Sequence, residues 1–221
     1  MSDLTHTFII ADDHPLFRTA MVQTLTRQYP KAALVEAEDL HSLQQVIPRY
    51  KEADLVLLDL HMPGACGFSG LIFITNHFPS LPVLMVSASD DVDIIQRAIE
   101  HGAAGFLSKT ASMEEIAEAI AAVLDGEIFL PKGITVSQTP LSQQERDLAS
   151  IVASLTPSQF RVASMLAEGL PNKLIAYELH VTEATVKAHI TEVFRKLGVS
   201  SRTQAGLLFS KLNVETQHKE G

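Results

Sequence analysis

Carboxylate, hydroxyl and amine side chains follow four β-rich segments in the N-terminal half of the chain, each where a segment ends. Asp12 and Asp13 follow the first β-rich segment, Asp59 ends the third, Ser87 ends the fourth and Lys109 follows the fifth. Because the carboxyl ends of parallel strands meet along one edge of a sheet, we expect these side chains to converge. Three carboxylates brought together repel one another unless a cation lies among them. A divalent cation that prefers oxygen ligands, most simply Mg²⁺, would relieve that repulsion.

The predicted chemistry is phosphoryl transfer to Asp59. An ionised aspartate beside Mg²⁺ can attack a phosphoryl group and form an acyl phosphate. The transferring group carries negative charge on three oxygens, which Mg²⁺, the Lys109 ammonium and the Ser87 hydroxyl could each neutralise or bind. Each residue alone has an ordinary interpretation, since an aspartate at a strand end usually caps a turn. Their occurrence at successive strand ends favours the phosphoryl-transfer site.

The segments that position these side chains alternate in type over the first 125 residues. Short β-rich segments are separated by amphipathic stretches of helix length, which is typical of a parallel sheet covered by helices on both faces. We therefore predict an α/β domain with a five-stranded, doubly wound parallel sheet. The expected strands are Thr7–Ala11, Ala33–Glu36, Leu55–Leu58, Val83–Ser87 and Gly105–Leu107, and the expected helices cover residues 15–28, 40–50, 67–77, 91–101 and 113–125.

The motifs at this edge resemble those of receiver domains in two-component response regulators, over about residues 5–125. The matching segments are Phe8–His14 (FIIADDH), Leu58–Gly64 (LDLHMPG), Val86–Ala88 (VSA) and Gly105–Lys109 (GFLSK). The resemblance implies a flavodoxin-like fold, with Asp59 as the phosphoacceptor and a sensor histidine kinase as the partner that phosphorylates it.

The resemblance also implies a metal-ligand set. Asp13 and Asp59 would bind Mg²⁺ directly, Asp12 would bind it largely through water, and the backbone carbonyl of His61 would be the remaining protein ligand.

A switch is implied by the same resemblance. Ser87 and Lys109 would contact the phosphoryl group, and Phe106 would rotate inward when Ser87 is drawn toward it. Such a switch is a population shift, because the phosphoryl group binds better to one position of Ser87 than to the other. Without the surrounding motifs, Phe106 would be an ordinary core aromatic.

A segment without periodicity separates this domain from the C-terminal helices. Residues 126–141 contain two glycines and two prolines in no regular pattern, which indicates a linker. A short helix is expected from Ser142 onward. We predict a receiver domain over residues 5–125, a linker with a short helix over 126–154, and a helix-turn-helix domain over 155–215.

The C-terminal domain is predicted to be all-α, with four helices near residues 157–168, 172–179, 183–197 and 202–212. The short connection at His180–Val181 suits a helix-turn-helix. Along the third helix, one side is apolar and the other is small, polar and basic, which suits a major groove. The apolar side carries Val186, Ile190, Val193, Phe194 and Leu197, and the other side carries Ala184, Lys187, Ala188, Thr191 and Arg195.

The expected DNA contacts divide into bases and phosphates. Lys187, Ala188 and Thr191 are predicted to reach base edges. Residues near helix ends are predicted to contact phosphates. The full set of predicted DNA-binding residues is Asn172, Lys173, Thr182, Thr185, Lys187, Ala188, Thr191 and Arg195. A four-helix docking module with solvated charges fits the local pattern equally well.

A second resemblance favours DNA binding. Leu166–Lys173 (LAEGLPNK), Thr185–His189 (TVKAH) and Lys196–Arg202 (KLGVSSR) are similar to LuxR-type DNA-binding domains, within about residues 155–212. Together with the receiver, the chain resembles the NarL/FixJ subfamily. That resemblance implies that an unphosphorylated receiver masks the recognition helix and that the last helix contributes to pairing.

The distribution of charge permits a nucleic-acid partner even though the whole chain carries −9. Residues 1–125 carry 7 Lys+Arg against 17 Asp+Glu, whereas residues 156–212 carry 7 against 4. Only the second segment could approach DNA without strong repulsion.

Composition predicts the class and location of the protein. A hydrophobic fraction of 46% over 221 residues excludes a disordered chain and leaves room for two domains. The N-terminus lacks a leader-like segment, and no apolar run reaches the roughly 18 residues that span a membrane. The single cysteine, Cys66, permits no internal disulfide and is expected to be a loop residue rather than a redox sensor. A cytoplasmic location is predicted.

We therefore predict a transcription regulator, not an enzyme, that is phosphorylated on Asp59 and binds double-stranded DNA. Because one domain has few basic residues for phosphate contacts, we expect a homodimer on a repeated site. Two alternatives stay open. The first is a Mg²⁺-dependent phosphotransferase that turns over a small substrate through an aspartyl phosphate. The second is a regulator of the same fold controlled by a partner or ligand instead of phosphorylation.

Overall fold

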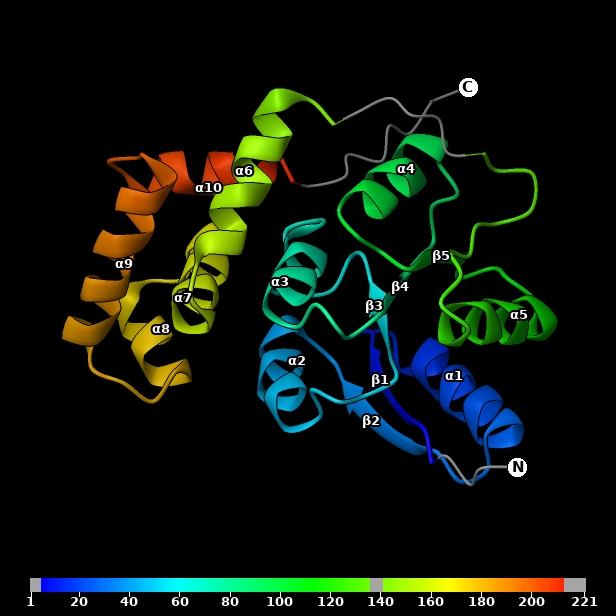
Figure 1. Cartoon of the computed structure of the whole chain (residues 1–221). Helices are drawn as coiled ribbons and strands as arrows, with labels where there is room; N and C mark the ends of the chain where they lie inside the picture. The colour runs from blue at the N-terminus through cyan, green and yellow to red at the C-terminus, as the bar shows by residue number, and fades with distance from the viewer. Residues whose placement is uncertain (1–4, 136–140, 213–221) are drawn as a thin grey trace.

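The computed structural model describes residues 5–135 and 141–212. Its N-terminal part is a five-stranded parallel sheet in the order β2-β1-β3-β4-β5, with helices on both faces (Figure 1). The strands are β1 Thr7–Ala11, β2 Ala33–Ala37, β3 Leu55–Asp59, β4 Val83–Ser87 and β5 Gly105–Ser108. The doubly wound α/β architecture predicted from the sequence is confirmed.

Two apolar layers enclose the sheet. The helices α1 Pro15–Gln28 and α5 Met113–Leu124 cover one face. The helices α2 Leu40–Val46, α3 Ser69–His77 and α4 Val92–Glu100 cover the other. Every residue of β3 and β4 is buried, as expected for central strands covered on both faces, and these strands end in Asp59 and Ser87. The polar side chains of these two strands therefore lie at the strand ends.

The C-terminal part is all-α, and its local sequence sets the helix ends. Thr156 and Gln159 form a reciprocal capping box, and the Thr182 side chain accepts from the backbone N–H of Thr185. Gly198, with φ of 65°, ends the longest of these helices in the left-handed conformation. The helices are α6 Gln143–Ser154, α7 Pro157–Ala167, α8 Asn172–Glu178, α9 Glu183–Leu197 and α10 Arg202–Ser210.

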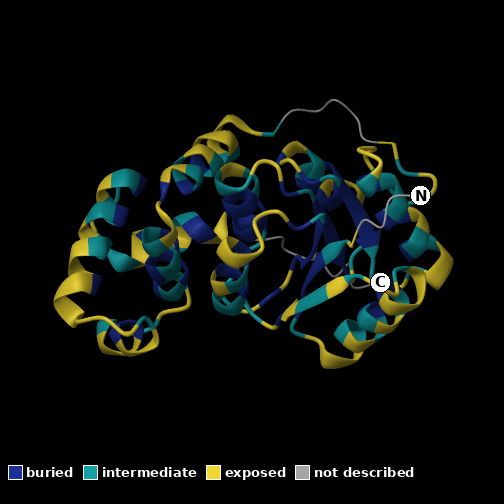
Figure 2. Ribbon diagram, turned by 60° about the horizontal axis from the view of Figure 1, so that its bottom comes forward, coloured by how far each residue is buried: buried dark blue, intermediate teal, exposed yellow. Residues whose placement is uncertain are grey.

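A shared apolar core joins the two parts of the chain. Helix α6 lies along α3 (Figure 1), and one cluster of buried side chains continues from the α3 face of the sheet into α6, α7, α9 and α10. Phe73 of α3 stacks on Phe160 of α7, with ring centroids 4.6 Å apart and planes 7° apart. Buried residues accordingly run from the sheet into the neighbouring helices (Figure 2).

Polar contacts border this shared core. Glu145 of α6 accepts hydrogen bonds through Oε1 from Arg97 Nε at 2.8 Å and from His101 Nε2 at 2.9 Å. The backbone N–H of Phe68 donates to the carbonyl of Leu212 at 3.2 Å, just after α10. The receiver-like part therefore contacts α6, the first helix of the C-terminal part, and the segment that follows α10.

Apart from shifts of one or two residues at element ends, the structure differs from the predicted elements in two places. The helix expected over residues 40–50 is divided into α2 and a short 3₁₀ helix, η1 Ile47–Arg49, because Pro48 has no N–H for the α-helical hydrogen bond. Within the predicted linker, Phe129 forms a parallel bridge with Gly105, at the outer edge of β5. The predicted domain end at residue 215 and linker residues 136–140 lie outside the described residues.

No helix within the described residues, 5–135 and 141–212, is able to cross a membrane. None combines the necessary length and apolarity.

Candidate functional site

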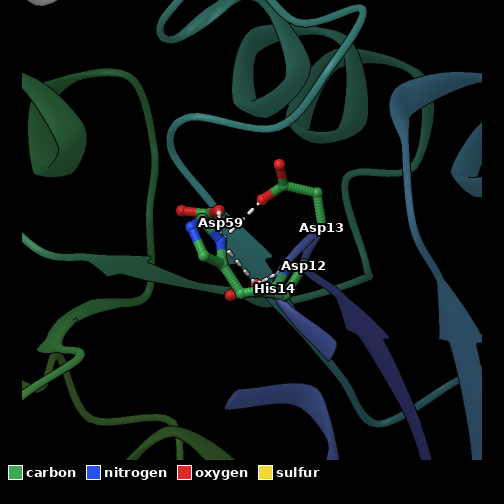
Figure 3. A group of neighbouring side chains, drawn as sticks. All are labelled: Asp12, Asp13, His14 and Asp59. Carbon is green, nitrogen blue, oxygen red and sulfur yellow. Dashed lines mark hydrogen bonds and ion pairs between the residues drawn. The ribbon is translucent and has the colours of Figure 1, made fainter. Parts of the chain in front are cut away.

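The carboxylates predicted to converge do meet at the carboxyl edge of the sheet. Asp12 and Asp13 follow β1, Asp59 ends β3, and one ligand atom from each, together with one from His14, lies within 4.8 Å of the others (Figure 3). Asp12 and Asp59 are each 2% exposed. Parallel pairing of β1 with β3 brings these strand ends together.

Lys109 supplies a cation to this acidic cluster from the loop after β5. Its Nζ lies 2.8 Å from Asp12 Oδ2 and 2.9 Å from Asp59 Oδ2. The backbone N–H of Lys109 donates to the carbonyl of Ser87 at 2.7 Å, which ties the lysine loop to the end of β4. The ammonium also lies 5.2 Å from the centroid of the Phe17 ring.

Burial and neighbouring charges shift the pKa values of Asp59 and Lys109. Burial raises the pKa of Asp59 and the charge of Asp12 adds to that effect, while the hydrogen bond and charge of Lys109 oppose it. Burial acts to lower the pKa of Lys109, but its hydrogen bonds to the two aspartates outweigh burial and raise it. Lys109 is therefore protonated at neutral pH.

His14 also belongs to the cluster, although no role is predicted for it from the sequence. Its Nδ1 lies 2.7 Å from Asp13 Oδ1, 3.3 Å from Asp12 Oδ1 and 3.1 Å from Lys109 Nζ. The side chain is 60% exposed, so it borders the solvent side of the site. Its place directly after the Asp12–Asp13 pair is the signal that could have identified it.

The carboxylates fit a divalent cation. Asp12 Oδ2 and Asp13 Oδ1 are buried oxygens whose near neighbours are the Lys109 ammonium, 2.8 Å from Asp12 Oδ2, and His14 Nδ1, 2.7 Å from Asp13 Oδ1. Oxygen atoms of this kind are the ligands that Mg²⁺ prefers. The backbone N–H of His61 donates to Asp59 Oδ1 at 3.3 Å, so residue 61 borders the site.

The two residues of the expected switch lie close to this edge in a buried environment. Ser87 is fully buried, and its Oγ accepts from the backbone N–H of Ser89 at 3.1 Å. Phe106 is also fully buried. Phe106 packs in the core cluster on the α3 and α4 side of the sheet.

The predicted DNA-binding face is open. Lys187, Ala188, Thr191 and Arg195 are all exposed on α9, whereas Val186, Val193 and Leu197 are buried on its other side. Helix α9 lies on the side of the helical part away from the sheet, at the far left of Figure 1. Masking of the recognition helix by the receiver, which the resemblance implied, is not the arrangement of this structure, because the receiver packs on α6, α7 and the end of α10 instead.

The flanking residues lie as expected for the ends of helices. Thr182 caps α9, Thr185 lies in its first turn, and Asn172 and Lys173 begin α8. His180, with φ of 52°, makes the turn between α8 and α9. Arg195 forms an ion pair with Glu192 at 2.9 Å on the surface of α9.

Comparison with protein families matches both parts of the chain. Residues 8–121 match the response regulator receiver domain, and residues 153–209 match the bacterial regulatory proteins of the luxR family.

Several curated proteins are similar over most of the chain. The glycerol metabolism activator of Pseudomonas putida is 38% identical over 89% of this chain and 91% of its own length. The transcriptional regulatory protein LnrK of Bacillus subtilis (strain 168) is 33% identical, covering 93% and 97%. The nitrate/nitrite response regulator protein NarL of Escherichia coli (strain K12) is 30% identical, covering 91% and 93%.

Solved structures show the same two-part architecture. A structure of two RcsB dimers bound to two parallel DNAs has a TM-score of 0.55 and 26% identity, covering 94% of this chain and 98% of that chain. RcsB from Salmonella enterica serovar Typhimurium, bound to promoter rprA with the phosphomimetic BeF3-, has a TM-score of 0.53 and 26% identity, covering 95% and 100%.

Proposed function

Because the chain belongs to the response-regulator family, with a receiver domain and a LuxR-type DNA-binding domain, we propose that phosphorylation of Asp59 controls its binding to DNA. The phosphoryl donor would be a sensor histidine kinase, and the bound DNA would be double-stranded and recognised by sequence. The observation that carries the proposal is the buried Asp59 carboxylate, 2.9 Å from Lys109 Nζ within a cluster of carboxylates.

In this mechanism, an oxygen of Asp59 attacks the phosphorus and forms an acyl phosphate as the bond to the kinase histidine breaks. Lys109 keeps its proton and neutralises a phosphoryl oxygen, and the Ser87 hydroxyl donates to another. Asp12, Asp13 and Asp59, with the carbonyl of His61, would hold Mg²⁺, which supplies positive charge to the phosphoryl oxygens.

The domain limits are part of the proposal. We assign residues 5–125 to the receiver, 126–154 to the linker with α6, and 155–215 to the DNA-binding domain. The family matches at residues 8–121 and 153–209 support this division. A cytoplasmic location remains a prediction from the sequence.

The DNA contacts are proposed on the open side of α9. Lys187, Ala188 and Thr191 would read base edges in the major groove, with Arg195 and the helix-end residues Asn172, Lys173, Thr182 and Thr185 on phosphates. A homodimer would double these contacts, and the RcsB dimers on DNA support that arrangement. The proposed partners are thus the kinase, which would phosphorylate the receiver, and the DNA, which the C-terminal domain would bind.

The test compares wild type, Asp59→Asn and the exposed control Asp93→Asn. Each is incubated with acetyl phosphate and Mg²⁺, and phosphoryl incorporation, molecular mass in solution and affinity for genomic DNA fragments are measured. We expect wild type and Asp93→Asn to incorporate about one phosphoryl group and bind selected fragments more tightly, whereas Asp59→Asn does neither. Unchanged DNA affinity after full phosphorylation of wild type would contradict the proposal.

A further inference from the structure

We propose that Arg18 is a positioning residue that holds the turn carrying Asp12 and Asp13 in the orientation that binds Mg²⁺. The inference rests on the proposed function of the acidic cluster. Arg18 lies on α1, and its Nη1 donates to the backbone carbonyl of Asp12 at 2.7 Å. Its Nε donates to Glu36 Oε2, on β2, at 2.8 Å. One guanidinium therefore connects the turn to a neighbouring strand.

The hydrogen-bonded carbonyl belongs to the peptide plane that joins Asp12 to Asp13. Because a peptide is planar, fixing its oxygen also fixes the direction in which the chain enters Asp13. The other side of Asp12 is fixed as well, since its N–H donates to the carbonyl of Ala37 at 3.1 Å. The backbone N–H of His14 donates to Asp12 Oδ1 at 2.7 Å and orients that carboxylate. Removing Arg18 would release the one side of this turn that no strand holds.

Burial holds Arg18 in place, and strand pairing holds the backbone of Glu36. The Arg18 side chain is only 16% exposed, and Glu36 pairs in register with Ile10 of β1, one strand away from the turn. The guanidinium uses two donors in a fixed fork, one for each partner. Lysine presents a single ammonium on a flexible stem and cannot reproduce both contacts in the same geometry.

An electrostatic role for Arg18 predicts the opposite effect from a positioning role. Arg18 is a positive charge near a cation site, so its removal reduces repulsion of Mg²⁺ and leaves Glu36 as an unpaired negative charge. Both changes would tighten Mg²⁺ binding. A positioning role predicts weaker binding, because the carboxylates of Asp12 and Asp13 lose their fixed orientation. The sign of the change therefore separates the two roles.

The experiment is calorimetric titration of Mg²⁺ into the full chain. The variants are Arg18→Met, Arg18→Lys, Glu36→Leu and the control Arg27→Met, which changes an exposed arginine in the last turn of the same helix. We expect Mg²⁺ to bind about tenfold more weakly to both Arg18 variants, as for other residues that orient metal ligands, and normally to Arg27→Met. Adding Glu36→Leu to Arg18→Met should weaken binding no further, because Glu36 acts through Arg18.

Three results would overturn the inference: Mg²⁺ binding to Arg18→Met that is as tight as wild type or tighter, full recovery in Arg18→Lys, or no Mg²⁺ binding by wild type. Thermal unfolding without Mg²⁺ shows whether a variant still folds. If Arg18→Met does not fold, Glu36→Leu tests the inference instead. We expect its Mg²⁺ affinity to fall less than that of the Arg18 variants, because Arg18 keeps its bond to Asp12.

Phosphoryl incorporation distinguishes this inference from the proposed function. If wild type binds Mg²⁺ but accepts no phosphoryl group, the proposed function is wrong, while the role of Arg18 is still decided by the Mg²⁺ affinities. If wild type is phosphorylated, Arg18→Met should need about tenfold more Mg²⁺ for half-maximal rate and should approach the wild-type rate at saturation.

Discussion

Replacing Glu145 with alanine should weaken the junction between the receiver and α6. The carboxylate is 15% exposed and accepts hydrogen bonds from both Arg97 and His101. Arg97 in turn lies 4.9 Å from the centroid of the Phe68 ring, within the shared core. The substitution removes the acceptor for both donors and leaves the apolar contacts of the junction in place.

The magnitude follows from how exposed each donor is. The His101 side chain is 3% exposed, so its N–H would lose its acceptor in a buried environment, at about 1–3 kcal/mol. Arg97 is 25% exposed and can be hydrated, so its ion pair contributes about 0–1 kcal/mol after screening. We expect a total loss of about 2 kcal/mol in the free energy of unfolding, or roughly a 30-fold change in the folded-to-unfolded ratio.

Urea unfolding followed by circular dichroism measures this loss. The set is wild type, Glu145→Ala, His101→Leu and the double variant, with the exposed Asp147→Ala on the same helix as control. Glu145 also lies in the first turn of α6, where a carboxylate interacts favourably with the helix dipole. That effect is the same with His101 and with Leu at this position, so it cancels in the double-mutant cycle. A coupling energy below about 0.5 kcal/mol between Glu145 and His101 would refute the reasoning.

Four further outcomes are expected. Burial lowers the pKa of His101 from 6.5, against opposing effects of its carboxylate neighbours, so the folded state binds this proton less readily than the unfolded state. Stability present above about pH 6.5 should therefore fall as the pH drops below it, and urea midpoints of His101→Leu should lose this slope. Burial raises the pKa of Cys66 from 9.0 to about 11, so its alkylation by iodoacetamide at pH 8 should be about 100-fold slower than that of a free thiol. Alkylation as fast as that of a free thiol would contradict the raised pKa. A Cβ on Gly105 would lie 2.9 Å from a linker carbonyl oxygen, so Gly105→Ala should cost about 1–3 kcal/mol in thermal unfolding, whereas Gly206→Ala, with no neighbour within 4 Å, should not destabilise. Lys187→Ala should weaken specific DNA binding by about 1–3 kcal/mol and affect bulk DNA much less, as filter binding at several salt concentrations would show.

The strand ends and the recognition helix could be predicted because their signals are local. Buried runs in β3 and β4 stop at Asp59 and Ser87, and the observed limits of α1 and α9 equal the predicted residues 15–28 and 183–197. Pro15 begins α1, and Thr182 and Gly198 bound α9. Such caps act within a few residues, so the sequence around each helix end contains the whole signal.

The junction between the domains could not be predicted, because its contacts join residues that have no local relation. Phe73 and Phe160 each occur in amphipathic helices, and nothing in either segment indicates that the two rings stack. Glu145 lies where an acidic residue commonly begins a helix, so its pairing with Arg97, 48 positions earlier, has no separate signal. The position of Phe106 could not be predicted either, since one sequence serves both positions of a switch.

The linker contact at β5 also affects how the protein can associate with itself. Phe106 donates its N–H to the carbonyl of Phe129 at 2.9 Å, and Phe129 donates to Ala104 at 3.2 Å, so the chain's own backbone occupies part of one outer edge of the sheet. At the opposite outer edge, β2 carries the exposed charge of Glu36. Covered and charged edges are both poor templates for a strand from a second molecule. Self-association should therefore use helical surfaces, and sheet extension into ordered aggregates is disfavoured at both edges.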